Sequence, residues 1–320
     1  MTVSVIMPVF NASAYLARAI DTIVGQTWES WELIAIDDGS TDGSATLLDE
    51  YSQRDQRIHV VHQPNRGVAA SRQLGVSMAT GDYCIHVDAD DWVEPDYLRL
   101  LCEKAVQTDA DLVWCDAYED ENRLWRMTAA ESADRLIRDI LCQRHWGTLW
   151  NRLIRRELCQ DQGIRFPLCN MWEDMAFVVQ CLGRCRKVTY VNVPLYHYRQ
   201  LETSLTHTQS HRDISADHRK AIGCILDFMQ REAILDRYVY ELRGLQLFAV
   251  RDFIDDKRFV DYDAFLHTYP DAIAHIGEYP AYPWRLKCSA WLLQHGLAFL
   301  VPVVCRVDGV LRRLGLSKQI

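Results

Sequence analysis

The sequence predicts an α/β fold with a mostly parallel sheet, followed by a C-terminal region of helices. Over residues 1–115, short apolar runs alternate with segments whose apolar residues recur at helical spacing. Strands that alternate with helices indicate βαβ units, in which helices cover both faces of a parallel sheet. From about residue 212, the apolar residues follow helical spacing alone. We therefore expect a first domain over residues 1–210 and a helical region over residues 211–320.

The expected elements of the first domain follow in regular order. Strands are expected at residues 3–7, 33–36, 58–61, 83–87 and 111–115, with helices at 14–23, 44–53, 68–79 and after residue 95. Pro8 is expected to end the first strand, and Asn11 or Ser13 to cap the helix that follows. Further along we expect helices at 131–142 and from residue 173, and a strand at 188–191.

The composition is that of an ordinary globular protein. The 320 residues are 49% hydrophobic and 25% charged, and the net charge of −9 argues against nucleic acid as a partner. The 11 cysteines form no Cys-x-x-Cys pair, so we interpret them as reduced, mostly buried thiols of a cytoplasmic protein. We expect no signal peptide, because the chain opens on a strand, and no membrane-spanning helix, because no apolar stretch reaches about 18 residues.

Carboxylates gather at the end of the expected strand at 83–87. Asp88, Asp90 and Asp91 follow it within four residues, and like charges this close repel one another. A divalent cation such as Mg²⁺ or Mn²⁺ takes oxygen ligands and would relieve that repulsion. The alternatives are a solvated acidic turn and, for Asp91, a cap on the next helix. Asp37 and Asp38 end another strand, and ligands of such sheets bind outside the carboxyl ends of the strands, which favours the metal site.

The turn after the first strand argues against two common nucleotide-binding folds. Residues 8–12 read PVFNA and lack the glycines that let a pyrophosphate approach a helix N-terminus. A Walker loop is absent as well. Dinucleotide and P-loop chemistry are therefore disfavoured, and a nucleotidyltransferase would need a glycine- and lysine-rich loop at the same place.

Four motifs in order resemble those of family 2 glycosyltransferases, which are inverting enzymes of the GT-A fold. They are residues 5–11 (VIMPVFN), 36–42 (IDDGSTD), 65–72 (NRGVAASR) and 87–91 (VDADD). Residues 150–153 (WNRL), 173–174 (ED) and 198–199 (YR) resemble later family elements, so the resemblance covers about residues 1–205. The family usually has Lys where Arg152 stands, and the charge is kept.

The resemblance implies a UDP-sugar donor. Pro8 and Val9 would line the uridine pocket through their backbone. Asp38 would accept a hydrogen bond from the uracil N–H, because an ionised carboxylate is an acceptor only, and Asp37 is the second choice for that role. The alternative is that both acids cap the next helix.

The resemblance also implies a phosphate and metal site. Asp90 would bind Mn²⁺ or Mg²⁺ directly, and Asp88 would contact the metal or the ribose. Arg72 would face the nucleotide, the alternative being a surface arginine. Arg199 and Ser204 would close over the diphosphate, and residues 200–211 would form either a lid or an ordinary surface loop.

An inverting transfer also needs a base that accepts the proton of the attacking hydroxyl. Residues 173 and 174 are expected to open a helix, whose N-terminus stabilises an ionised carboxylate. The resemblance favours Asp174 as the base and Glu173 as a supporting or acceptor-binding group. The alternative is that both acids only cap the helix. Trp146, Trp150 and Trp172 are either sugar-stacking platforms or core residues.

The sequence thus predicts a metal-dependent, inverting hexosyl- or acetamidohexosyltransferase. The acceptor would be a saccharide or lipid-linked saccharide in surface-polysaccharide synthesis. The rival is a non-catalytic nucleotide-sugar or glycan-binding module on the same fold. In residues 284–316, apolar and basic side chains are interspersed and Asp308 is the one acid. This segment would either lie on the anionic inner face of the cell membrane, as a peripheral contact, or pack on the catalytic domain.

Overall fold

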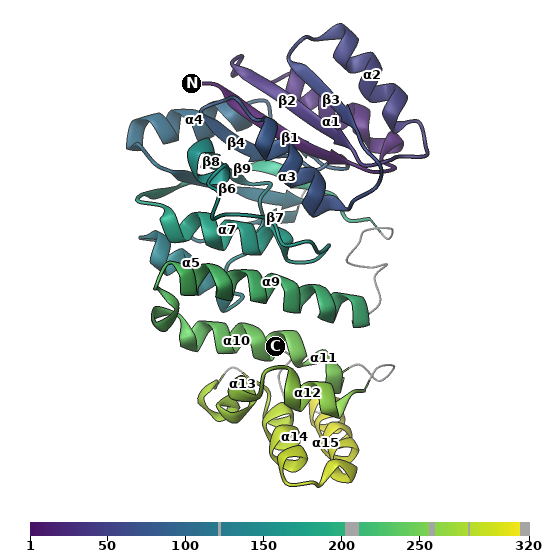
Figure 1. The fold of residues 1–320 in the computed structure, drawn as a ribbon, viewed down its shortest axis with the longest axis vertical. Coiled ribbons are helices and arrows are strands. Elements are labelled where there is room, and N and C mark those ends of the chain that lie inside the picture. Colours follow the sequence, from purple (N-terminus) through teal and green to yellow (C-terminus); the bar gives the residue numbers. More distant parts are fainter. Residues whose placement is uncertain (121–122, 202–210, 256–259, 281, 314–320) are drawn as a thin grey trace. The chain divides into compact units, whose positions relative to one another are not determined.

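The computed structural model describes residues 1–120, 123–201, 211–255, 260–280 and 282–313 (Figure 1). It contains two compact units. The first holds Met1–Gln209 and Lys220–Ile234, and the second holds Ser210–Arg219 and Leu235–Ile320. Helix α9 (His211–Arg231) contributes residues to both. The division of the sequence at residue 210 stays our prediction for the domain boundary.

A nine-stranded sheet forms the centre of the first unit, within the residues described. Its strand order is β3-β2-β1-β4-β8-β6-β9-β5, and β7 pairs with β6. The strands are β1 (Val3–Val9), β2 (Trp31–Asp37), β3 (Ile58–His62), β4 (Tyr83–His86), β5 (Trp92–Val93), β6 (Leu112–Glu119), β7 (Arg123–Trp125), β8 (Arg152–Arg155) and β9 (Val188–Tyr198). The β3-β2-β1-β4 half is parallel, whereas β8 is antiparallel to both β4 and β6. The predicted α/β fold is confirmed.

Helices pack on the strands as the βαβ pattern requires. They are α1 (Ser13–Val24), α2 (Ser44–Arg54), α3 (Val68–Met78), α4 (Tyr97–Thr108), α5 (Ala133–Leu141), α6 (Arg156–Cys159) and α7 (Glu173–Arg184). Helix α3 packs on β1 and β2, α4 packs on β6 and β9, and α5 packs on α7. In α1 the buried residues Leu16, Ala19, Ile20 and Ile23 recur at helical spacing and form its apolar stripe.

Three local predictions were wrong. Strand β1 continues through Pro8. Proline has no N–H to donate, but β4 pairs with β1 only as far as Ile6, so no neighbouring strand needs a hydrogen bond from Pro8 on that side. Neither Asn11 nor Ser13 caps α1 with its side chain. Asn11 instead accepts a hydrogen bond from the Thr41 N–H at 2.8 Å, so a tertiary contact replaces the local cap. Strand β9 extends seven residues beyond the expected 188–191 segment.

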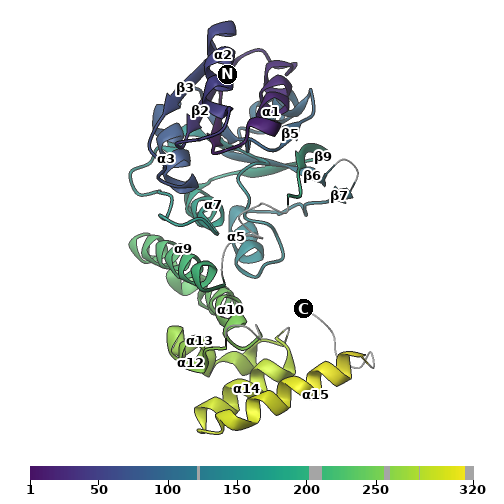
Figure 2. The same cartoon turned by 90° about the vertical axis from the view of Figure 1, so that its right-hand side faces the viewer.

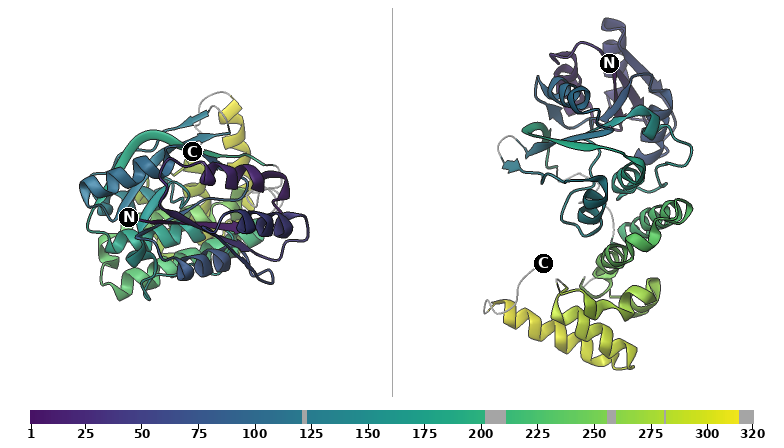
Figure 3. Two further views of the ribbon diagram at one scale, coloured as in Figure 1. Left: turned by 90° about the horizontal axis from the view of Figure 1, so that it is seen from above. Right: turned by 90° about the vertical axis from the view of Figure 1, so that its left-hand side faces the viewer.

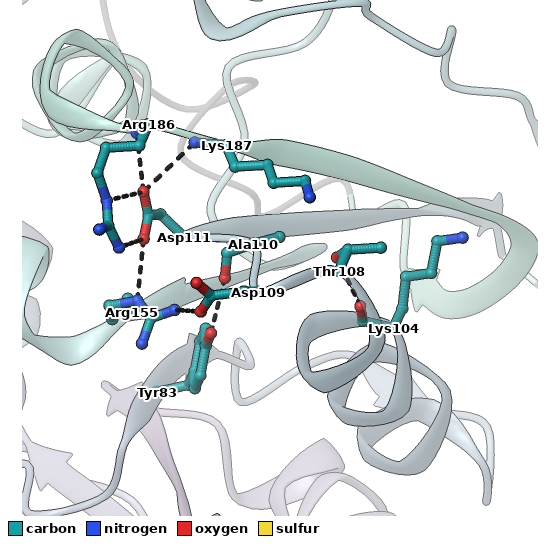
Figure 4. A network of polar contacts seen from close by, with 9 residues as sticks. All are labelled: Tyr83, Lys104, Thr108, Asp109, Ala110, Asp111, Arg155, Arg186 and Lys187. Carbon is teal, nitrogen blue, oxygen red and sulfur yellow. Dashed lines mark hydrogen bonds and ion pairs between the residues drawn. The ribbon is translucent and has the colours of Figure 1, made fainter.

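Asp111 ties the second half of the sheet together (Figure 4). Its carboxylate accepts hydrogen bonds from Arg155 Nε at 2.9 Å and from the backbone N–H of Arg186 at 2.8 Å. Its backbone carbonyl accepts from the Arg155 N–H at 2.8 Å, and its own N–H donates to the Lys187 carbonyl at 2.8 Å. The residue is 2% exposed and therefore joins the start of β6 to β8 and β9 from inside the protein.

The second unit is helical, as predicted. Its helices include α10 (Val239–Val250), α11 (Asp252–Asp255), α12 (Tyr262–Thr268), α13 (Pro270–Ala274), α14 (Trp284–Gln294) and α15 (Val301–Arg313). Helices α14 and α15 lie side by side (Figures 2 and 3). Leu286, Ala290, Leu293 and Val301 belong to the unit's buried core, so the C-terminal helices are part of its folded structure. Among the described residues, no helix is long and apolar enough to cross a membrane.

The cysteines are free, as expected. All 11 lie in described residues, and most are buried.

Candidate active site

A cavity of about 690 Å³ opens at the carboxyl ends of β1, β2 and β4. Its volume is in the range of sites that hold ligands of nucleotide size. Predicted site residues that line it are Pro8, Val9, Asp38, Arg72, Asp88, Asp90 and Glu173. The residues at the ends of β1, β2 and β4 meet at one edge of the parallel half of the sheet, and Arg72 and Glu173 reach the same cavity from α3 and α7. Ser204 lies outside the described residues.

Asp38 holds the loop that leads into α3. Its Oδ1 accepts hydrogen bonds from the Gln63 side-chain amide at 2.7 Å and from the Arg66 N–H at 2.8 Å. Its Oδ2 accepts one from the Gly67 N–H at 2.8 Å, and Gly67 has a φ of 87°, which favours glycine. These three donors use three of about four acceptor positions on a carboxylate, so Asp38 shapes the cavity wall and still has room for one ligand donor.

Asp37 has a different environment from its neighbour and is not among the residues that line the cavity. Its carboxylate accepts from the Ser40 N–H at 3.0 Å and lies 2.8 Å from His62 Nδ1. Burial raises the pKa of Asp37, but the hydrogen bonds from Ser40 and His62 outweigh it and hold the pKa below its ordinary value. Neither Asp37 nor Asp38 caps α2, whose Ser44 N–H is bound by Asp42 at 2.9 Å.

Arg72 lies in the interior, between two acids from distant parts of the chain. It is 6% exposed, so the alternative of a surface arginine is wrong. One guanidinium nitrogen donates to Asp88 at 2.8 Å, and the other forms an ion pair with Glu173. Burial by itself would lower the pKa of Arg72, but the charges of Asp88 and Glu173 raise it above its ordinary value. The guanidinium therefore stays charged at the cavity wall.

Asp88 and Asp90 fit the donor set of a hard divalent cation. Both carboxylates line the cavity, and burial together with the charge of Asp88 raises the pKa of Asp90 to about 6. Such a site favours either a proton or a cation, and oxygen ligands select Mg²⁺ or Mn²⁺. No group of three or more His, Cys, Asp or Glu in the described residues is arranged for a metal. The two acids fit an ion that takes its remaining ligands from water and substrate phosphate, as Mg²⁺ commonly does.

Asp91 is a structural residue that links the acidic turn to the end of β9. It is 2% exposed, and its carboxylate accepts from the Tyr196 hydroxyl at 2.6 Å and from the Arg199 N–H at 2.8 Å. The suggestion that Asp91 caps the next helix is wrong, because α4 begins only at Tyr97. Arg199 also donates from Nε to the Asp90 carbonyl at 3.0 Å, which places its guanidinium beside the acidic turn.

Glu173 and Asp174 open α7, as expected. Glu173 lines the cavity and pairs with Arg72, whereas Asp174 is not among the lining residues and accepts from the Met175 N–H at 2.6 Å. Burial raises the pKa of both carboxyls, and the charge of Arg72 acts in the opposite direction. A raised pKa makes an ionised carboxylate a stronger base.

Two tyrosines of β9 were missed as individual site residues. Tyr198 lines the cavity, and the Tyr196 hydroxyl accepts from the Asp88 N–H at 3.1 Å while donating to Asp91. The available signal was their alternation on one face of an extended segment that ends in Arg199. Sequence reasoning stopped the strand at residue 191 and so did not place them.

Comparisons with known proteins agree with this architecture. The model of the family described as Glycosyl transferase family 2 matches residues 4–177, more than half of the chain. The Bacillus subtilis (strain 168) protein named "Putative glycosyltransferase EpsH" is 33% identical over 211 residues, which are 62% of this chain and 60% of that protein. The chain thus spans less than two thirds of the length of this relative.

Two solved structures share the fold. S. aureus TarS in complex with UDP-GlcNAc has a TM-score of 0.74 at 17% identity, over 100% of this chain and 93% of that one. The mannosyltransferase PcManGT from Pyrobaculum calidifontis, in complex with GDP-Man and Mn²⁺, has a TM-score of 0.52 at 17% identity, over 93% and 80%. These likenesses confirm the predicted GT-A fold, and the family match shows that the chain belongs to glycosyl transferase family 2.

Proposed function

We propose that the protein transfers a glycosyl group from a UDP-sugar to an acceptor hydroxyl, with inversion at the anomeric carbon. The observation that carries this proposal is the single cavity that Asp38, Arg72, Asp88, Asp90 and Glu173 line together. In this proposal Asp38 belongs to the wall that binds the nucleotide, and Asp88 and Asp90 form the acidic turn that holds a divalent ion. The buried guanidinium of Arg72 supplies a positive charge beside that turn. The family membership and the UDP-GlcNAc complex of TarS support the choice of donor.

The uridine would lie against Pro8 and Val9 at the end of β1. The last acceptor position of Asp38 would take the uracil N–H, while its other three hydrogen bonds keep the loop at residues 63–67 in place. Asp37 is the weaker candidate for this contact, because Ser40 and His62 already bind its two oxygens.

The diphosphate would lie between the acidic turn and the cations. A divalent ion held by Asp88 and Asp90 would neutralise the negative charge on the departing diphosphate. Manganese in the PcManGT complex supports this assignment. Arg199 would add charge-assisted hydrogen bonds, and Ser204 stays a candidate from sequence alone.

Asp174 would act as the base. The acceptor oxygen forms the new bond to the anomeric carbon, its proton passes to the Asp174 carboxylate, and the old sugar–phosphate bond leaves with its electron pair on UDP. Glu173 suits the task less well because its carboxylate is committed to the Arg72 ion pair. Burial raises the pKa of Asp174, which strengthens it as a proton acceptor.

The acceptor would be a saccharide or a lipid-linked saccharide of a surface polysaccharide. The name of EpsH specifies no acceptor. A peripheral place at the cytoplasmic membrane face is supported by an exposed apolar stripe on α15. Val303, Val307 and Val310 recur along this helix and are 51%, 46% and 56% exposed. Arg306 and Arg313 are exposed on the same helix, which suits an anionic surface.

The deciding experiment is UDP release from a panel of UDP-sugars with Mn²⁺ or Mg²⁺, with and without EDTA. We expect metal-dependent release with one donor, at a rate that rises when an acceptor is added. A non-catalytic binding module would bind UDP but release none from any donor, and that result would refute the proposal.

A further inference from the structure

Five aromatic side chains form a continuous row beside the candidate active site. In order they are Trp146, Trp125, Tyr198, Trp150 and Tyr196, and neighbouring rings are stacked with centroids 4.5–5.9 Å apart. The row begins inside the protein, where Tyr196 is 0% and Trp150 is 4% exposed, and it ends at Trp146, which is 57% exposed. One face of the Trp146 ring stacks on Trp125, so the solvent-exposed surface of Trp146 is the remainder of its side chain.

The loop that carries Trp146 is held from within. The buried guanidinium of Arg152 donates to the carbonyls of Trp146 and Thr148, and His145 Nδ1 lies 3.0 Å from the Trp146 carbonyl. Arg152 is 0% exposed. An exposed tryptophan on a loop anchored by a buried arginine is an ordered feature of the surface.

The inner part of the row contacts the candidate site, and the loop at its exposed end packs on α7. Tyr198 lines the cavity, and Tyr196 donates to Asp91 in the acidic turn. At the exposed end, a Cβ at Gly147 would stand 2.5 Å from the Met175 side chain, so this loop packs directly against the first turn of α7. Asp174 is the residue before Met175, and its charge acts on Arg152.

Strand β7 brings Trp125 into the row. It pairs with β6 outside the main strand order, as Figure 2 shows, and its register places Trp125 opposite Ala117. The Met127 N–H donates to the buried Asp116 carboxylate at 2.6 Å, which fixes the chain just after the strand. The hairpin thus holds Trp125 against Tyr198 and provides the support on which Trp146 stacks.

We propose that Trp146, supported by Trp125, is the acceptor platform, on which a pyranose ring of the acceptor saccharide lies. This inference rests on the proposed function and adds the acceptor class and its binding place. A pyranose ring offers a face of C–H groups that suits an indole, and the hydroxyls at its edge stay free to react. The residue after Trp146 packs against the helix turn that carries the proposed base, and the row continues to the cavity that would hold the donor.

The test compares Trp146→Ala and Trp146→Phe with the wild type, using Trp291→Ala as the matched control. Trp291 lies on α14 in the other unit and is 55% exposed, close to the value for Trp146. The wild type is first screened with UDP-sugars, Mn²⁺ and methyl glycosides of common hexoses and acetamidohexoses. The best pair is then used to measure acceptor KM, donor KM and the UDP-sugar hydrolysis rate without acceptor.

We expect Trp146→Ala to raise the acceptor KM roughly three- to tenfold, in line with the strength of an aromatic stacking contact. Donor KM and hydrolysis should stay at wild-type values, Trp146→Phe should restore most of the acceptor affinity, and Trp291→Ala should change none of these quantities. An unchanged acceptor KM in Trp146→Ala would overturn the inference. So would an equal rise in donor KM, because it would mean that Trp146 only supports the fold.

Octyl glycosides of the same sugars separate the ring from a lipid chain. A Trp146 effect of equal size on methyl and octyl glycosides supports recognition of the ring, and an effect on octyl glycosides alone refutes it. If the wild type hydrolyses a UDP-sugar but no glycoside accelerates UDP release, the saccharide platform is wrong while the donor site stands. If no UDP-sugar is hydrolysed or transferred, the proposed function itself fails.

Discussion

Arg72 and Glu173, 101 positions apart in the sequence, form a buried ion pair at the cavity wall. The same guanidinium binds Asp88 at 2.8 Å, so one arginine connects the candidate metal turn with the start of α7. Removing one partner of such a pair leaves an uncompensated buried charge, which is costly. The pair is the reason why we propose Glu173 as the residue that balances the charge of Arg72, and its neighbour Asp174 as the proton acceptor.

Asp174→Asn should reduce kcat by at least ~10²-fold while donor binding is retained, because general-base catalysis contributes about that much. Glu173→Gln should keep measurable turnover but weaken donor binding, since Arg72 loses one of its two counter-charges. Steady-state kinetics and UDP titration of both variants check this. Wild-type turnover in Asp174→Asn with an inactive Glu173→Gln would reverse the two roles, and activity in both would place the base elsewhere.

Asp90→Asn should abolish transfer without unfolding the protein, because an amide cannot replace an anionic oxygen ligand for a hard cation. EDTA should have the same effect on the wild type, with recovery on addition of Mn²⁺. Asp82→Asn, at an exposed position in the turn before β4, is the control and should remain active. Full activity of Asp90→Asn, or of the wild type in EDTA, would contradict the metal assignment.

Asp38→Ala should weaken UDP binding by on the order of 1–3 kcal/mol and reduce the preference for UDP over CDP, since both depend on a charged acceptor. Calorimetric titration with the two nucleotides measures this. Gln63→Ala removes one donor from the Asp38 carboxylate and keeps the carboxylate itself, so it should retain the UDP preference. Equal affinity of the wild type for UDP and CDP would count against uracil recognition by Asp38.

Asp111→Ala should lower the free energy of unfolding by roughly 2 kcal/mol at neutral pH, the usual worth of charged hydrogen bonds. Burial raises the pKa of Asp111, but hydrogen bonds from Arg186 and Arg155 hold it below its ordinary value. Because the folded-state pKa is the lower one, this stabilisation is present above the unfolded-state pKa and is lost as pH falls through the folded-state pKa. Urea unfolding at several pH values should show wild type and variant converging in acid. A constant difference across that range would refute the assignment.

Val307→Glu should reduce binding to vesicles of phosphatidylcholine and phosphatidylserine several-fold, because it places a negative charge in the exposed stripe of α15. Val106→Glu is the matched control on α4, where the valine is 65% exposed. Vesicle sedimentation measures both. Point variants are preferable to truncation after residue 283, since α14 and α15 supply core residues of the second unit. Equal binding of all three proteins would exclude α15 as a membrane contact.

Local patterns in the sequence determined the parallel half of the sheet, its helices and the acids at its strand ends. Apolar periodicity and turn residues act over a few positions, so β1 to β4 and the opening of α7 could be predicted. The carboxyl ends of parallel strands necessarily share one edge, which is why Asp38, Asp88 and Asp90 could be expected in one site.

Tertiary structure decided what each acid binds. Asp37 and Asp38 are adjacent in the sequence, yet one binds Ser40 and His62 and the other binds the loop before α3. The aromatic row depends on β7, β8 and β9, whose pairings join segments far apart in the sequence, and the Arg72–Glu173 pair likewise joins α3 to α7. Such contacts form only when the chain has folded, because burial and the loss of water determine which charges and rings come together.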